Sequence, residues 1–165
     1  PPGIDAIELS RVVDRGIRES HSIDTKKLCI EKGEKIWMIC IDIITINAAG
    51  NLIDAAGIAS LAALKDAKFP KYEGGELDYE TKTKEGIPLE NDPLPVTVYK
   101  IGDNLFVDPL PEEEKAVDAR LTVAVTVDGQ LCAMQKGGGV PLSVEEIDKM
   151  IGIALQNAQE IRKAL

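Results

Sequence analysis

The sequence has few of the residues from which metal sites, disulfide frameworks and membrane spans are built. Its three cysteines are odd in number and include no CxxC pair, which argues against a disulfide framework or a zinc site and favours a reducing cytoplasm. The single histidine, His21, makes a histidine-based metal or catalytic site unexpected. No apolar run is long enough to cross a membrane. We therefore expect a cytoplasmic protein with no cofactor, no metal and no membrane association.

The start of the sequence also lacks two common features. It opens with Pro-Pro-Gly, without the basic stretch of a signal peptide and without methionine, so we expect a fragment of a longer protein. Its 165 residues suffice for one domain or two small halves, and the 44% hydrophobic content supports a core. The net charge of −9 argues against nucleic-acid binding over the whole surface, although not against one local basic groove.

The first segment with a clear periodicity is 7–20, which carries three of the five arginines. Its apolar residues recur at helical spacing and gather on one side of the helical wheel, which predicts an amphipathic helix. Asp5 is the expected N-cap, and Glu8, three residues later, would close a capping box. Such a helix buries its apolar side and leaves the arginines on the other.

The three arginines of this helix, Arg11, Arg15 and Arg18, follow one another at i, i+4 and i+7 and form one row. Arginine offers a rigid fork of donors that matches a phosphate in two bonds. A row of such forks could therefore follow a nucleic-acid backbone. The alternative is a solvated helix face on which the arginines pair with Asp14 and Glu19.

The region after this helix is predicted to form strands. Lys26–Glu31 is predicted as a strand, and 31–34 as a hairpin turn. The run Ile36–Ile46 is nearly all apolar and rich in β-branched residues, which predicts a central strand covered on both faces. Asp42 interrupts this run, and a carboxylate in that place is more often hydrogen-bonded or at a subunit seam than catalytic.

A helix and an irregular region are predicted to complete the first part of the chain. After a turn at 47–51, the segment 52–68 is predicted as a buried helix whose many small residues let it lie close to a sheet. The segment 69–93, rich in Gly, Lys and Glu, is predicted as a long loop with room for one short strand. It is also the best boundary between two halves, which we place at 1–92 and 93–165.

The second half has clearer signals. Two hairpins are predicted at 96–107 and 121–135, the latter with an Asp-Gly pair typical of a type I′ turn. The triple glycine at 137–139 lacks the ending of a phosphate-binding P-loop and is predicted as a flexible link. The last helix is expected to begin at Ser143, capped together with Glu146. Helices and hairpins in this order indicate an α/β (α+β) fold.

An acidic stretch, 108–120, connects the two hairpins and carries five carboxylates. Crowded carboxylates can hold a divalent cation or act as a general acid. They can equally belong to a solvated connector. The sequence of this stretch does not by itself distinguish the two interpretations.

The order and spacing of several short motifs resemble the RNase PH family, in particular the non-catalytic RNase PH-like subunits of archaeal exosomes. The motifs are Arg11/Arg15/Arg18, Asp54-Ala55-Ala56, Val107-Asp108-Pro109, the glutamates 112–114, Asp118-Ala119-Arg120 and Gln135-Lys136-Gly137. The resemblance covers nearly the whole chain and corresponds to the latter part of such a subunit. It implies the RNase PH-type fold (ribosomal protein S5 domain 2-like) with its opening strands missing.

The resemblance also implies a set of partners. In this family, catalytic and non-catalytic subunits alternate as a trimer of dimers around a central pore. Single-stranded RNA enters the pore and is shortened from its 3′ end, with inorganic phosphate as the attacking group. The implied partners are a catalytic RNase PH-like exosome subunit in a hetero-hexameric ring, exosome cap subunits that carry RNA-binding domains, and single-stranded RNA.

The departures from the active members concern both parts of the chemistry. Active relatives hold phosphate with Gly-Gly-(Ser/Thr)-Arg-Ser at the turn into the buried helix, where this chain has Asn51, Leu52 and Ile53. They also carry two aspartates after the glutamate run, at positions matched here by Lys115 and Arg120. A cation cannot serve as the acid or the metal ligand. These five are therefore interpreted as degenerate active-site positions.

The resemblance thus implies a non-catalytic, RNA-binding subunit of a phosphorolytic 3′→5′ exoribonuclease ring. The arginine row, which in the family lies toward the RNA path, would bind the RNA backbone and support the catalytic partner. One alternative is that the chain is itself a phosphate-dependent exoribonuclease with an acidic site at 108–118. Another is a pure assembly scaffold, in which the arginines serve the subunit interface.

Overall fold

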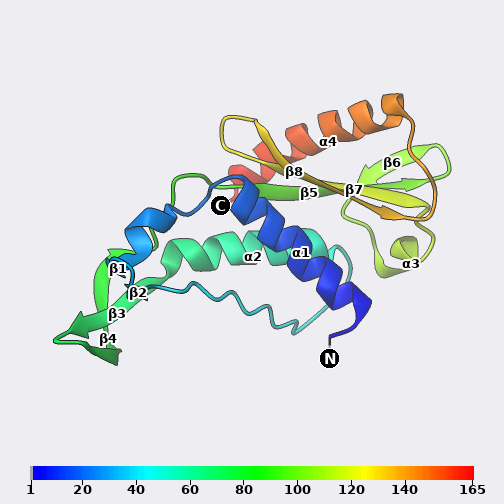
Figure 1. Ribbon diagram of the computed structural model, residues 1–165. Coiled ribbons are helices and arrows are strands. Elements are labelled where there is room, and N and C mark those ends of the chain that lie inside the picture. The colour runs from blue at the N-terminus through cyan, green and yellow to red at the C-terminus, as the bar shows by residue number, and fades with distance from the viewer. Residues whose placement is uncertain (1) are drawn as a thin grey trace.

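The computed structural model describes residues 2–165, which form three layers. A four-stranded sheet lies in the middle, helix α4 covers one face, and helices α1 and α2 cover the other (Figure 1). This arrangement confirms the mixed α/β class. The elements in chain order are α1 (Ile4–Glu19), a 3₁₀ helix (Thr25–Leu28), β1 (Cys29–Glu31), β2 (Lys35–Ile36), α2 (Leu52–Asp66), β3 (Lys68–Glu73), β4 (Glu76–Gly86), β5 (Leu94–Ile101), β6 (Asn104–Val107), α3 (Pro111–Glu114), β7 (Ala119–Val125), β8 (Leu131–Gly138) and α4 (Val144–Arg162).

The central sheet has the strand order β6-β5-β7-β8, and each neighbouring pair is antiparallel. The predicted hairpins 96–107 and 121–135 are confirmed as β5–β6 and β7–β8. The predicted flexible link at 137–139 is wrong, because Gly137 and Gly138 belong to β8 and pair with β7. The strand continues there because the glycines leave room for neighbouring groups of β7.

The hydrophobic core lies between the sheet and α4. Met150 of α4 is fully buried at the centre of this layer. It is surrounded by apolar side chains from β5, β7 and α4 itself, among them Val96, Val98, Leu121, Val123, Val125, Ala154 and Ala158. The predicted cap of the last helix is confirmed, since Ser143 Oγ accepts from the N–H of Glu146 at 3.2 Å.

Helices α1 and α2 approach the other face of the sheet closely because small residues lie at the contacts. A Cβ added to Gly57 of α2 would lie 2.1 Å from Cγ of Pro95, and one added to Gly16 of α1 would lie 3.6 Å from Cβ of Ala124. The predicted close packing of a small-residue helix on a sheet is therefore confirmed. The helix ends at Asp66, two residues before the predicted end.

The amphipathic helix α1 is confirmed, but its predicted start is not. The helix begins at Ile4 after Gly3 as N-cap, so Asp5 lies inside the first turn and is not the cap. A carboxylate in the first turn is still favourable there, because it faces the positive end of the helix dipole. The capping box predicted between Asp5 and Glu8 is also wrong. Glu8 instead forms an ion pair with Arg120 of β7.

The apolar run 36–46 does not form the central strand that was predicted. Only Lys35–Ile36 is in a strand, and the residues after it run extended past α2, on the side away from the sheet (Figure 1). Within residues 2–165 no strand pairs with the run beyond Ile36, and Ile44 and Ile46 are 84% and 98% exposed. A strand needs a neighbouring strand to pair its backbone groups, so the apolar composition of the run was not sufficient to make it a strand.

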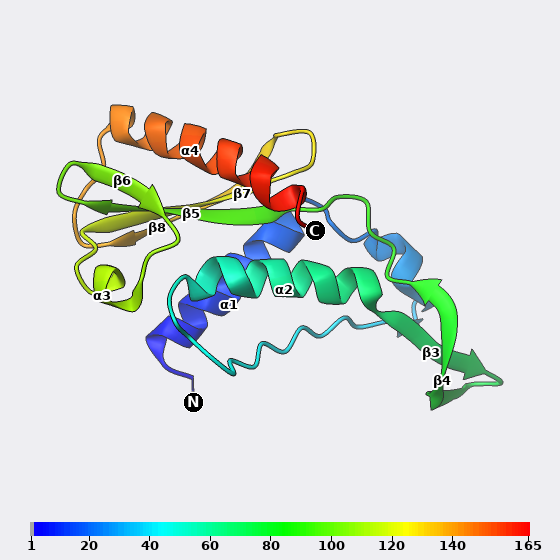
Figure 2. The same cartoon turned by 180° about the vertical axis from the view of Figure 1, so that it is seen from behind.

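The strand predicted at 26–31 is shorter, because its first part is the 3₁₀ helix Thr25–Leu28, while the hairpin turn at 31–34 is confirmed. The predicted loop 69–93 is largely a hairpin, β3–β4, which extends away from the three layers (Figure 2). Its base is fixed by Phe69, whose ring centre lies 5.1 Å from that of Trp37. Among residues 2–165, the helices are too short or too polar to cross a bilayer.

Candidate functional site

The turn into α2 and the acidic connector, which are about sixty residues apart, lie against each other. Gly50 has φ 105°, and a Cβ there would lie 2.3 Å from the carbonyl oxygen of Pro109. Asn51 Nδ2 donates to Oδ1 of Asp108 at 3.3 Å, and Asn51 N–H donates to Oε1 of Glu114 at 2.8 Å. The fold thus brings together the two segments that the resemblance to the RNase PH family predicts to be a degenerate phosphate loop and a degenerate acidic site.

The amino end of α2 is occupied by a carboxylate of the chain itself. Asn51, the N-cap, adopts the left-handed conformation at φ 49° and ψ 41°, which directs its N–H at Glu114. The amino end of a helix is a favourable place for an anion, because unpaired N–H groups and the helix dipole meet there. Glu114 supplies that negative charge intramolecularly. Leu52 and Ile53, the next two residues, contribute only apolar side chains.

Tyr99 of β5 completes the hydrogen bonds of Asn51. Its Oη donates to Oδ1 of Asn51 at 3.3 Å, and its ring lies 6.0 Å from that of Phe106. Burial raises the pKa of the Tyr99 phenol well above its usual value, and the nearby carboxylates Asp54 and Glu114 act in the same direction. Tyr99 is therefore a neutral donor at physiological pH, and both the amide oxygen and the amide nitrogen of Asn51 are engaged.

Asp54, in the first turn of α2, is a buried carboxylate that joins three elements. Its two oxygens accept from the N–H of Thr97 at 2.9 Å and from Thr97 Oγ1 at 2.6 Å, and Thr97 Oγ1 lies 2.8 Å from Thr122 Oγ1. Burial raises the pKa of the Asp54 carboxyl, and the bonds from Thr97 oppose that shift. The sequence analysis quoted Asp54 within a motif but gave it no role. An acid in the apolar first half of this helix was the available signal.

The two cations at the positions predicted to be degenerate acidic sites, Arg120 and Lys115, have different surroundings. Arg120 of β7 forms a 2.6 Å ion pair with Glu8 of α1, and its guanidinium fills the space beside Gly137, where a Cβ would lie 2.6 Å from Cζ. Lys115 is exposed at the end of α3 and makes no ion pair within residues 2–165. Arg120 is therefore held in place by α1 and β8, whereas Lys115 extends into solvent.

A cavity of about 670 Å³ lies beside this site. It is bounded by α1, the extended run after β2 and the start of α2, and its lining includes Glu8, Asp42, Leu52, Ile53, Glu114 and Arg120. No group of three or more His, Cys, Asp or Glu residues in the described part of the chain is arranged to hold a metal ion. Asp42 is exposed, and within that part no hydrogen bond accounts for it, so its place at a subunit seam stays a prediction.

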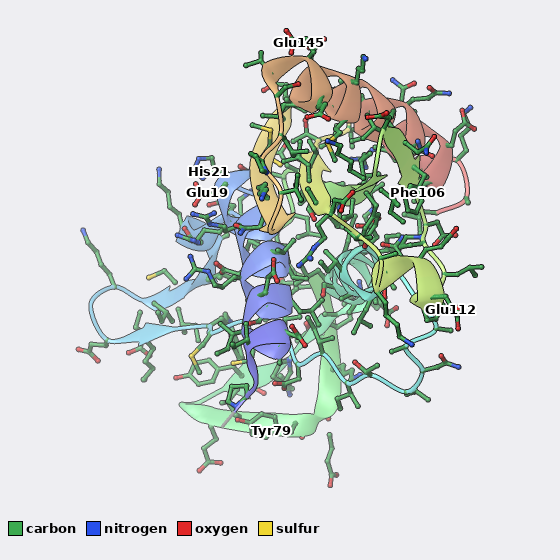
Figure 3. All side chains as sticks on the ribbon, turned by 90° about the vertical axis from the view of Figure 1, so that its right-hand side faces the viewer. Glu19, His21, Tyr79, Phe106, Glu112 and Glu145 are labelled. Carbon is green, nitrogen blue, oxygen red and sulfur yellow. The ribbon has the colours of Figure 1, made fainter. Side chains whose placement is uncertain are left out.

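The arginine row lies farther along α1. Arg18 pairs with Asp14 at 3.2 Å and with Glu19 at 3.5 Å, as the solvated-face interpretation predicted. Figure 3 shows Glu19, at the carboxyl end of α1, well separated from Glu112 on α3. The carboxyl end of α1, which carries Arg18, is therefore distant from α3.

The other two arginines of the row are not paired with these carboxylates. Arg15 is half-buried, and its Nη1 donates to Oε1 of Gln135 on β8 at 3.2 Å, a contact that sequence reasoning missed. Arg11 is exposed and makes no hydrogen bond or ion pair within residues 2–165. The row is therefore mixed in character: the pairing expected of a solvated face holds for Arg18 alone, and the contact of the row with RNA stays a prediction.

Comparison with known proteins agrees with this architecture. Residues 1–70 match a model described as domain 1 of the 3′ exoribonuclease family, and residues 93–157 match domain 2 of the same family. The chain is 42% identical to the exosome complex component Rrp42 of Methanothermobacter thermautotrophicus, over 98% of this chain and 60% of that protein. It is 46% identical to the Rrp42 component of Pyrococcus horikoshii, over 99% of this chain and 61% of that protein.

Solved structures give the same result. The chain is similar to a subunit of the Archaeoglobus fulgidus exosome with RNA bound to the active site, with a TM-score of 0.89 and 38% identity over 99% of this chain and 63% of that one. An archaeal exosome core gives a TM-score of 0.88 over 97% of this chain and 63% of that one. The chain thus spans about three fifths of the length of these relatives. Domains 1 and 2 of one family match this chain in order and together cover most of its length. The chain therefore belongs to the 3′ exoribonuclease family of RNase PH proteins.

Proposed function

We propose that this chain is part of a non-catalytic, RNA-binding subunit of an exosome ring, a phosphorolytic 3′→5′ exoribonuclease complex. Its relatives carry the name of an exosome component, and a similar subunit lies in an exosome with RNA bound to the active site. The activity resides in a catalytic RNase PH-like partner subunit. Arg11, Arg15 and Arg18 bind the RNA backbone and help to place the 3′ end in the partner's site.

The observation that carries the non-catalytic role is the hydrogen bond from Asn51 N–H to the Glu114 carboxylate. Inorganic phosphate, the attacking group of phosphorolysis, would need the donors at the start of α2. The Glu114 carboxylate already accepts from one of them, the Asn51 N–H, and its negative charge would repel a second anion. Leu52 and Ile53 offer no side-chain donor in compensation.

The acid side of the chemistry is missing in the same place. Arg120 is paired with Glu8, and Lys115 is a solvent-exposed cation, so neither supplies the carboxyl group that would bind a metal or act in the place of the aspartates of active relatives. Four of the five carboxylates of the connector are engaged with the backbone or with Asn51. Glu113 accepts from Leu110 N–H and Asp118 from Gly102 N–H, while Asp108 and Glu114 accept from Asn51. These contacts support a structural role for the segment 108–118.

The arginine row supports the RNA-binding role because its charge stands out on an acidic chain. Contacts to phosphate are independent of base identity, which suits a strand that is drawn past the site. The further partners that we propose are cap subunits and the other subunits of a hetero-hexameric ring. Three free cysteines favour a reducing compartment such as the cytoplasm. The division into halves at 1–92 and 93–165 remains part of the proposal.

The test uses the full-length protein. It is expressed alone, together with its catalytic RNase PH-like partner, and the partner is also expressed alone. Each sample is assayed for phosphate-dependent shortening of an oligoribonucleotide, with and without Mg²⁺. We expect no turnover by this protein alone and strong turnover by the assembled pair. Turnover by the purified protein that is lost in Asp118→Asn would instead favour the enzyme alternative.

A further inference from the structure

The three guanidinium groups of the arginine row have different surroundings. Arg18 faces two carboxylates, those of Asp14 and Glu19, and its side chain is 62% exposed. Arg15 is half-buried against β8 and meets Gln135. The partner of Arg18 is therefore charged, whereas the partner of Arg15 is neutral.

Gln135 is itself oriented by the strand. Its Nε2 donates to the carbonyl oxygen of Lys136 at 3.3 Å, which directs Oε1 at Arg15. In the β7–β8 register Gln135 lies opposite Thr122, a buried residue whose hydroxyl belongs to the network that holds α2 on the sheet. The amide that meets Arg15 thus comes from a well-ordered part of the sheet, not from a loop.

A neutral acceptor does two things for an arginine. It fixes one N–H of the guanidinium, and it leaves the positive charge and the other N–H groups available. Because the side chain is held before any ligand arrives, part of the rotamer entropy that binding would cost is already lost. A carboxylate partner would fix the guanidinium too, but it would cancel the charge and compete with a phosphate.

We propose that Gln135 is a positioning residue that holds the guanidinium of Arg15 for contact with a phosphate of single-stranded RNA, so that Arg15 is the strongest contact of the row. The inference rests on the proposed RNA-binding function and assigns unequal roles within it. Arg11 contributes positive charge, but within residues 2–165 no hydrogen bond orients its guanidinium group. Arg18 contributes least, because its charge is already compensated.

The experiment uses full-length protein assembled with its catalytic partner, and a fluorescently labelled oligouridylate as the probe. Affinity is measured by anisotropy over a series of salt concentrations. Arg15→Ala should weaken binding by about tenfold, and Gln135→Ala by about two- to tenfold with an unchanged salt slope, since no charge is lost. Gln135→Glu should weaken binding further and make the slope of log affinity against log salt shallower by about 0.7, because the new carboxylate neutralises one phosphate contact.

Gln156, exposed on α4, provides the matched controls: Gln156→Ala and Gln156→Glu should bind RNA like the wild type. A double-mutant cycle then separates positioning from a general structural effect. In the Arg15→Ala background, Gln135→Ala should have no further effect, and the thermal midpoint should stay unchanged in each variant.

The outcomes distinguish this inference from the function on which it rests. If Arg15→Ala weakens binding but Gln135→Ala does not, the positioning role is wrong while the RNA-binding function stands. If Gln135→Ala weakens binding equally with and without Arg15, the positioning role is also wrong. If Arg15→Ala and Arg11→Ala both leave binding unchanged, the RNA-binding function itself fails, and this inference with it.

Discussion

The turn into α2 and the arginine row of α1 lie over the same face of the sheet, but their polar groups are satisfied in different ways. At the turn, Asn51 is bonded through its N–H, its amide nitrogen and its amide oxygen to Glu114, Asp108 and Tyr99. In the row, Arg15 makes one bond to a neutral amide. The first surface is closed on itself, whereas the second retains capacity for a ligand.

Under the proposed function, this difference is how a binding surface would be retained while a chemical site is lost. The carboxylates at the turn also serve the packing, because their bonds to Asn51 fix the connector and α3 to the start of α2. Leaving the row partly unpaired has a cost in stability, since like charges on one helix face repel. A surface that keeps unpaired charge in an acidic protein is therefore the better candidate for a function than one that satisfies itself.

The largest expected effect comes from reversing the charge of the row. Changing Arg11, Arg15 and Arg18 to Glu in the full-length subunit should reduce RNA affinity by more than about a hundredfold, because up to three charge-assisted contacts are lost and repulsion replaces them. Degradation by the assembled ring should fall with it, although the α2 turn is untouched. Filter binding and a gel-based shortening assay measure the two quantities.

Lys163, the C-cap of α4, supplies the control for that variant. It pairs with Glu160 and is 70% exposed, so Lys163→Glu should change RNA binding little. Size-exclusion chromatography with light scattering reports whether the ring still forms. A triple variant that binds RNA normally would make the row a solvated face. One that fails to assemble would place the row at a subunit seam and favour the scaffold alternative.

A smaller effect is expected at the closed surface, where Asp54 holds α2 on the sheet. Asp54→Ala removes both acceptors of Thr97 and leaves a buried N–H unpaired, which should lower the free energy of unfolding by about 1–3 kcal/mol. RNA affinity should not change. Urea unfolding of the full-length protein gives the first quantity, and Asp66→Ala, exposed at the other end of α2, is the matched control.

The loss of folding stability caused by Asp54→Ala should depend on pH in a defined direction. Burial raises the pKa of the Asp54 carboxyl above its usual 3.8 in the folded state, so the folded protein binds that proton more tightly than the unfolded chain. The contribution of Asp54 to stability is therefore fully present below pH 3.8 and decreases as the pH rises through the raised value. The destabilisation by Asp54→Ala should be larger in acid than at neutral pH, and a difference that grows with pH would contradict this assignment.

The contrast between the two surfaces also explains what the sequence could reveal. The hairpins of the sheet and the capped helix α4 were predictable, because turn chemistry and periodicity act over a few residues. The run 36–46 was not, since its composition demands a neighbouring strand that residues 2–165 do not provide. The pairs Glu8–Arg120 and Arg15–Gln135 join residues more than a hundred positions apart, so only the folded chain brings them together.

The smallest expected effect sharpens the comparison within the row itself. Asp14→Asn removes one of the two carboxylates that compensate Arg18, and so makes Arg18 more like Arg15. RNA affinity should rise by about twofold at low salt, a small gain because the pair is exposed, and the gain should vanish at high salt, where screening removes it. Glu160→Gln makes the same change beside Lys163 and should have no effect. Unchanged affinity in Asp14→Asn, combined with a loss in Arg18→Ala, would mean that RNA already displaces the carboxylates, and compensation would then not explain the unequal roles of the arginines.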